Sequence, residues 1–141
     1  MFYRSLGLIA WMTVQLAPVS GQEQWPRFLG VNFDGTVEPA ASFDWSQEPA
    51  LAWSIEAGTG YGIGSVAEGR YLHFDAVPAA DGFGVQERLR SFDLDSGELQ
   101  WVHTQPIVYR DLYGYEDGPR SSATVNGNQI FTLGVSGNLT C

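Results

Sequence analysis

Beyond residue 21, apolar side chains recur at two-residue spacing, and glycine or asparagine interrupts them every several residues. This spacing is typical of short β-strands with one buried face, whereas a helix would repeat about every 3.6 residues. In the stretch SVAEGRYLHF (65–74), Leu72 and Phe74 should face one side of a strand and Tyr71 and His73 the other. The pattern predicts an all-β fold without helices.

Short runs of turn-forming residues separate the predicted strands and indicate three β-hairpins. Asn-Gly is a strong signal for a two-residue hairpin loop, because both residues tolerate a positive φ. The 17 glycines of the chain, spread over such short strands, are also typical of an all-β protein. We expect the hairpins to turn at Glu68–Gly69, at Asp95–Ser96–Gly97 and at Asn126–Gly127.

The acidic stretch SFDLDSGELQW (91–101) allows three interpretations: a calcium loop, a pair of acid/base carboxylates, or the corner of a hairpin. An EF-hand loop counted from Asp93 would place Gly97 at a ligand position, a glutamate where glycine is required and a threonine where the bidentate glutamate belongs. Asp93 and Glu98 have no evident histidine or apolar pocket to separate their pKa values. We therefore favour the corner, in which Gly97 adopts the left-handed conformation and Trp101 packs in the core.

The order of strand, glycine-rich link and hairpin occurs twice. Trp53 and Trp101 each lie on the predicted strand that opens one such unit, and they are 101 − 53 = 48 residues apart. This spacing is close to the period of about 40–50 residues found for four-stranded propeller blades.

The charge and cysteine content exclude several classes of function. The chain carries a net charge of −9, and its seven basic residues are all arginines. Such a surface repels nucleic acid and anionic lipid headgroups. The absence of lysine excludes a Walker-type, Schiff-base or kinase-type lysine within this sequence. The single cysteine, Cys141, excludes an internal disulfide and a zinc site built from cysteines.

The first residues follow the order of a secretory signal peptide. Arg4 precedes an apolar run over residues 6–14 and small residues at 19–21. The run is shorter than the roughly 20 residues that cross a bilayer, so we expect no membrane anchor. Gln22 follows the expected cleavage site, where a lipoprotein requires cysteine. We expect a periplasmic or extracellular protein composed of a signal peptide (1–21), an N-terminal extended segment (22–49) and β-repeats (50–141).

Three stretches resemble pyrroloquinoline quinone (PQQ)-type β-propellers of secreted bacterial proteins. SFDLDSGELQW is similar to their repeat signature through Asp93, Ser96, Gly97 and Trp101. QWPRFLGVNFDG (24–35) is similar to the opening of these proteins, and DGPRSSATVNGNQIFTLGVSGNLTC (117–141) is similar to one of their later segments. The resemblance covers nearly all of the mature chain. It implies a partial propeller of about two four-stranded antiparallel blades, with further blades supplied by a longer parent chain. In the family, the tryptophan docks against the neighbouring blade, while the Asp and Gly hold the corner.

The resemblance implies two functions. In the first, the propeller is a non-catalytic binding or scaffolding protein that meets a protein, peptide or glycan at the mouth of its channel. In the second, the parent is a dehydrogenase that oxidises an alcohol or sugar with PQQ and calcium. The family's catalytic Asp, calcium ligands, stacking Trp and vicinal cysteines match no positions here. We therefore expect no catalytic, cofactor-binding or metal-binding residue in this chain, and we favour the first function.

The loop VYRDLYGYEDGPR (108–120) concentrates tyrosines, carboxylates and arginines, which could stack on a sugar and bond its hydroxyls. Alternatively, its tyrosines pack over the neighbouring strands. Tyr61 and Arg120 each precede the first strand of a hairpin, which lies nearest the axis in family members, so both are candidate ligand or channel residues. We expect His73 and His103 to be ordinary strand residues.

Overall fold

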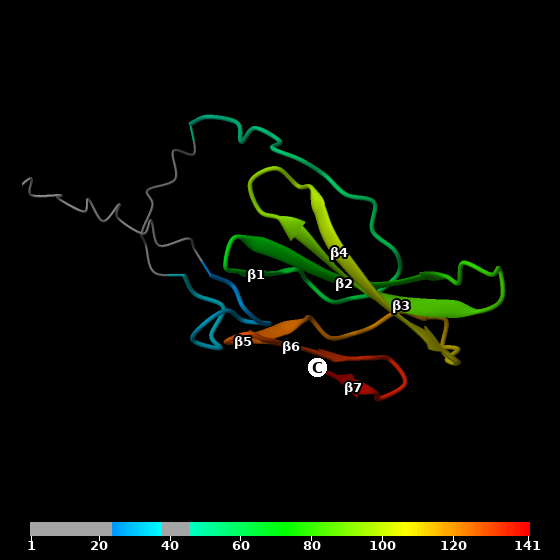
Figure 1. Ribbon diagram of the computed structural model, residues 1–141. Helices are drawn as coiled ribbons and strands as arrows, with labels where there is room; N and C mark the ends of the chain where they lie inside the picture. The colour runs from blue at the N-terminus through cyan, green and yellow to red at the C-terminus, as the bar shows by residue number, and fades with distance from the viewer. Residues whose placement is uncertain (1–23, 38–45) are drawn as a thin grey trace, which may run out of the picture.

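The computed structural model describes residues 24–37 and 46–141, and its strands form two antiparallel β-sheets (Figure 1). The first sheet has four strands in sequential order and the second has three. The bounds of the first four are β1 Ser65–Ala67, β2 Arg70–Pro78, β3 Val85–Asp93 and β4 Leu99–Ile107. Those of the second sheet are β5 Thr124–Asn126, β6 Gln129–Leu133 and β7 Leu139–Thr140.

The described residues contain no helix, so the prediction of an all-β fold is confirmed. It follows that this part of the chain has no helix long and apolar enough to cross a bilayer. The expected signal peptide (1–21) lies outside the described residues. Where a second group of four strands was expected, the structure has the three strands β5, β6 and β7.

The core lies between the two sheets. Leu72, Phe74 and Leu89 of the first sheet form a buried cluster with Ala123, which lies directly before β5. The side chains of Trp101, Val125 and Ile130 pack against this cluster. The predicted separation of the two pairs is confirmed. Leu72 and Phe74 belong to the buried cluster, whereas Tyr71 contacts Trp53 and its hydroxyl lies 3.3 Å from Nδ1 of His73 on the other face of the sheet.

The hairpin turns agree with the sequence at two sites and differ by one residue at the third. β1 and β2 are joined through Glu68 and Gly69, and β3 and β4 through residues 94–98. At the third site Asn126 still pairs with Gln129, so the loop consists of Gly127 and Asn128 rather than Asn126 and Gly127. Gly127 has φ +57° and supplies the positive φ of the loop, which leaves Asn126 in the ladder.

The prediction that Trp53 lies on a strand is wrong. Residues 46–58 form no ladder, and backbone pairing with the first sheet begins at the isolated bridge between Thr59 and Ala76. Trp53 is held through its side chain instead, as described below.

The described part of the N-terminal segment contacts both sheets. Trp25 pairs with Val66 of β1 through two backbone hydrogen bonds of 2.8 and 2.9 Å. The carbonyl of Pro26 accepts a hydrogen bond from the backbone N–H of Val125 in β5 (2.7 Å). Residues 27–35 then form a series of turns, so this segment is not simply extended.

Candidate functional site

The acidic stretch 91–101 forms a hairpin corner. One carboxylate oxygen of Asp93 accepts hydrogen bonds from the backbone N–H and the hydroxyl of Ser96, both at 2.9 Å. These two bonds hold the pKa of Asp93 below its usual value. Gly97 has φ +72°, and its N–H donates to the carbonyl of Asp93 (2.9 Å). The carboxylate of Asp93 therefore stabilises the turn. We call residues 93–97 the Gly97 corner.

Trp53 packs directly on the Gly97 corner. A Cβ atom on Gly97 would lie 2.6 Å from Cγ of Trp53, so a larger residue does not fit there. The indole Nε1–H donates to the carbonyl of Leu94 (2.9 Å). The ring also stacks on Phe92 and meets Tyr71 edge-on, with centroids 6.5 and 5.5 Å apart. A tryptophan that precedes the first sheet is thus fixed on a turn of that sheet.

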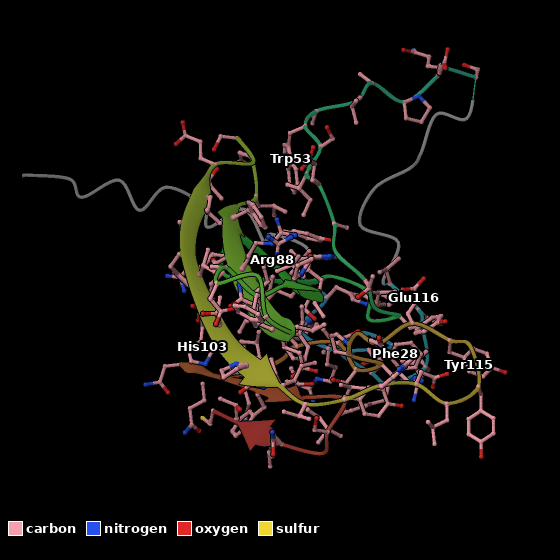
Figure 2. All side chains as sticks on the ribbon, turned by 90° about the vertical axis from the view of Figure 1, so that its right-hand side faces the viewer. Phe28, Trp53, Arg88, His103, Tyr115 and Glu116 are labelled. Carbon is pink, nitrogen blue, oxygen red and sulfur yellow. The ribbon has the colours of Figure 1, made fainter. Side chains whose placement is uncertain are left out.

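Trp101 of β4 lies on the face of the first sheet that packs against the second. It is half-buried and also lines a cavity of about 300 Å³ at one end of the interface between the sheets. His103 lines the same cavity. Figure 2 shows His103 on the opposite side of the molecule from Tyr115.

The candidate binding site is an open cavity of about 430 Å³ that gathers four tyrosines. Its lining consists of Tyr61, Tyr109, Asp111, Tyr113, Tyr115 and Arg120. We call this set the tyrosine cup. Both candidate residues from the sequence, Tyr61 and Arg120, lie in it, and each stands four residues before the first strand of its sheet. The corner residues Asp93, Gly97 and Trp101 do not contribute to its lining.

Contacts between the segment before β1 and the segment before β5 bring Tyr61 to the loop of residues 108–120. The N–H of Tyr61 donates to the carbonyl of Pro119 (2.9 Å), and its hydroxyl accepts from the N–H of Glu116 (3.4 Å). Gly118 is buried, and a Cβ atom there would collide with the carbonyl of Thr59. The absence of a side chain at Gly118 is therefore what lets the segments around residues 60 and 119 run side by side.

Asp111 organises the loop of the tyrosine cup. One of its carboxylate oxygens accepts the N–H groups of Tyr113 and Tyr115, both at 2.8 Å. The other accepts from the guanidinium of Arg120 (2.9 Å) and the hydroxyl of Tyr109 (3.4 Å). The Asp111 side chain is only 4% exposed. The backbone bonds, chiefly that from Tyr115, and the bond from Arg120 hold the pKa of Asp111 below its usual value.

Arg120 is less enclosed than its partner. Its side chain is 47% exposed, and its guanidinium carbon lies 5.9 Å from the centre of the Tyr109 ring. Hydrogen bonds to Tyr109 and Asp111 raise the pKa of Arg120 above its ordinary value. Because the oxygens of Asp111 are already occupied, the groups left to meet a ligand are the N–H donors of Arg120 and the tyrosine rings and hydroxyls.

A second polar cluster is buried on the opposite face of the first sheet from the core. Asp75 of β2, 1% exposed, accepts from Nε and Nη2 of Arg88 (2.7 and 3.0 Å) and from Arg90 (2.8 Å). It also accepts from the N–H of Gly58 (2.7 Å), while Arg90 donates to the carbonyl of Glu56 (2.9 Å). Figure 2 shows Arg88 beneath the segment that carries Trp53. The cluster ties this segment to the sheet.

The protonation states in the Asp75 cluster follow from burial and charge. Burial raises the pKa of Asp75, but the hydrogen bonds from Arg88 and Gly58 and the two guanidinium charges outweigh it, so that the pKa lies below the usual value. Burial lowers the pKa of His73, and the carboxylate of Asp75, 3.6 Å away, only partly offsets this. His73 is therefore neutral at pH 7.

Tyr71, His73 and Asp75 lie in a row along β2, with 3.3 Å between the Tyr71 hydroxyl and Nδ1 of His73. The row does not constitute a nucleophile–base–acid arrangement. Burial raises the pKa of Tyr71, which opposes its ionisation, and Asp75 is engaged by two arginines. Sequence reasoning missed this cluster, although Arg88 and Arg90 flank Leu89 at the two-residue spacing of a strand face, which was the available signal.

Among residues 24–37 and 46–141, no group of three or more His, Cys, Asp or Glu side chains is arranged to hold a metal ion. Comparison with known proteins adds no family: no protein-family model, curated protein or solved structure matches the chain significantly.

Proposed function

We propose that this chain forms two blades of an exported, PQQ-like β-propeller that binds its ligand without catalysing a reaction. The observation that carries the proposal is the tyrosine cup, an open aromatic cavity built at equivalent positions ahead of the two sheets. The propeller architecture is supported by two successive antiparallel sheets that pack face to face through Leu72, Phe74 and Ala123.

The contact between Trp53 and the Gly97 corner also supports the propeller architecture. The resemblance implies that the tryptophan of each repeat docks on the neighbouring blade, and Trp53 contacts a corner 97 − 53 = 44 residues further along the chain. Under this architecture, Tyr61 and Arg120 would lie beside the innermost strands, at the mouth of the central channel.

The alternative function, a PQQ- and calcium-dependent dehydrogenase, fits the described side chains less well. PQQ is a multiply anionic quinone that needs cationic and amide partners, a stacking ring and a calcium ion held by several oxygens. In the tyrosine cup, Arg120 is neutralised by Asp111, whose oxygens already accept four hydrogen bonds. Trp53 is committed to the Gly97 corner. We therefore favour binding over oxidation.

Titration of PQQ into the purified full chain, with calcium present, tests this proposal. Tryptophan fluorescence and calorimetry should both show no saturable binding. A one-to-one complex of micromolar affinity would overturn the proposal in favour of the dehydrogenase.

A further inference from the structure

Two of the three loop tyrosines do not pack over the neighbouring strands, contrary to one of the two expectations from the sequence. Tyr113 is 86% exposed and Tyr115 65%, whereas Tyr109 is half-buried. Tyr61, from the segment before β1, is 53% exposed. Exposed apolar surface of this size, gathered in one cavity, is characteristic of a binding site. Figure 2 shows Tyr115 and Glu116 on a loop that projects from the body of the molecule, where a large ligand has free access.

The loop is ordered before any ligand arrives. Asp111 fixes the backbone N–H groups of Tyr113 and Tyr115, and Asp117 accepts the N–H of Asp111 itself (2.6 Å). Little backbone entropy is therefore lost on binding. Tyrosine side chains also lose little entropy on binding, because they offer a large rigid ring and a hydroxyl with few rotatable bonds.

Charge restricts the class of ligand. Asp111 neutralises Arg120, and the chain as a whole carries −9, so an anionic ligand gains no net attraction. A cationic ligand is disfavoured inside the cavity, because the guanidinium of Arg120 is 47% exposed there whereas the carboxylate of Asp111 is only 4% exposed. The remaining chemistry consists of aromatic faces, phenol hydroxyls and guanidinium N–H donors. This combination complements a neutral molecule that has an apolar C–H face and a rim of hydroxyl acceptors.

We infer that the tyrosine cup binds a neutral oligosaccharide, with pyranose rings stacked on Tyr113 or Tyr115 and ring hydroxyls bonded to Arg120. This assignment rests on the proposed binding function and names its ligand class. The volume of about 430 Å³ falls in the range of small-molecule sites, roughly 300–1,000 Å³. Because the cavity is open, the sugar units beyond the bound ones remain in solvent, as the end or interior of a longer glycan requires.

The test measures binding of defined probes to the full chain by calorimetry. The neutral probes are cellohexaose, xylohexaose and maltohexaose, and the comparison probes are trigalacturonate and a neutral decaproline peptide. We expect at least one neutral hexasaccharide to bind and trigalacturonate to bind at least about tenfold more weakly. Tyr113→Ala and Tyr115→Ala together should weaken the neutral sugar about tenfold or more, whereas Tyr113→Phe retains the ring and most of the affinity.

Phe28→Ala provides the matched control. Phe28 is also an exposed aromatic residue (59%), and Figure 1 shows its segment, in blue, at the opposite end of the molecule from the loop of the tyrosine cup. This variant should bind the sugar as the wild type does. Circular dichroism of every variant checks that the fold is retained.

Three outcomes would overturn the assignment. They are no binding of any neutral hexasaccharide, a Tyr113/Tyr115 double variant that binds the sugar as tightly as the wild type, and a Phe28→Ala variant that loses as much affinity as the double variant. If decaproline binds to the wild type and not to the double variant, the glycan assignment is also overturned, yet the proposed binding function stands. Saturable binding of PQQ with calcium is the separate result that would remove the binding function itself.

Discussion

Gly97 satisfies two requirements that only glycine meets. Its φ of +72° is costly for any residue with a Cβ atom, and the space a Cβ would occupy is filled by the Trp53 ring. Gly82 meets the first requirement alone, because it has φ +78° but no atom within 4 Å of its ideal Cβ position. Comparing substitutions at Gly97 and Gly82 therefore separates the cost of backbone strain from the cost of side-chain contact.

Gly97→Ala should lower the free energy of unfolding more than Gly82→Ala does. Both variants lose about 1 kcal/mol or more from the left-handed backbone, and Gly97→Ala loses a further amount from displacement of the indole. In a Trp53→Ala background, the difference between the two alanine variants should shrink, because only the Cβ of residue 53, 2.9 Å from the added Cβ, remains. Urea unfolding of the six proteins measures this cycle. An equal cost in the wild-type background would show that Trp53 does not rest on Gly97.

Asp75 should make stability depend on acid. Its pKa is lower in the folded chain than its ordinary value of 3.8, so its contribution is complete above about pH 4 and is lost as the pH falls through the folded pKa. Asp75→Asn should cost about 3–5 kcal/mol at pH 7, because two guanidinium groups lose their buried partner. It should also flatten the acid limb of a plot of melting temperature against pH. An unchanged acid limb would contradict this.

His73 has its own pH window. Its pKa is lower in the folded chain than the ordinary value of 6.5, so the unfolded chain binds more protons between the two values and stability rises with pH there. His73→Gln should remove this slope just below pH 6.5 while leaving the acid limb due to Asp75. Melting temperatures at closely spaced pH values measure both regions, and a slope that persists in His73→Gln would assign it to another group.

At the level of elements, β3 holds the turn between β6 and β7. Glu87 of β3 is fully buried and accepts from the backbone N–H of Val135 (2.6 Å) and the side-chain amide of Gln105 in β4 (2.9 Å). Gly134 lies against the same carboxylate. The Glu87 side chain thus joins the two sheets at one end of their interface, and Ala67 and the turn between β5 and β6 lie at the other end.

Glu87→Gln should loosen the turn at residues 134–138. A glutamine presents only one acceptor oxygen, so one of the two donors faces an NH₂ group and loses its hydrogen bond, at a cost of about 1–3 kcal/mol. Hydrogen exchange at Val135 should accelerate. Glu98→Gln, at an exposed position next to the Gly97 corner, is the matched control and should leave this exchange unchanged. Equal exchange in both variants would remove Glu87 from the role assigned here.

The elements also show how far the sequence leads. Hairpin turns such as Glu68–Gly69 follow from two adjacent residues, so local chemistry determines them. The partners of Asp75 depend on the register that places it opposite Arg88, and on Gly58, which lies 17 residues away in the chain. The tyrosine-rich loop was visible in the composition, but its assembly with Tyr61 requires contact between distant links. Neither register nor such contacts can be inferred from a single sequence.

At the scale of the whole molecule, the two sheets share one core. Leu72, Phe74 and Leu89 pack against Ala123, which is fully buried, so neither sheet covers its apolar face without the other. Trp25 and Pro26 add backbone bonds to β1 and β5. The described chain should therefore unfold as one cooperative unit.

Leu72→Ala tests this cooperativity. Leu72 is 2% exposed, and its truncation should cost about 2–5 kcal/mol through lost contacts and a residual cavity. Native-state hydrogen exchange should accelerate by a similar factor in β2 and in β6. Faster exchange confined to the first sheet would show that the sheets are stable separately.

The burial of Arg88 and Arg90 also determines which peptide bonds trypsin can cleave in the folded chain. Without lysine, trypsin has only arginine sites to cut. Arg110 and Arg120 are exposed in the loop of the tyrosine cup, whereas Arg90 is buried and Arg88 is clamped by Asp75 within a strand. Arg70 is also exposed but lies within the ladder of β2, so the first tryptic cuts should fall beside the cup. The first sheet resists cleavage until it unfolds locally, so cleavage in the loop should abolish the proposed sugar binding before the sheets are degraded.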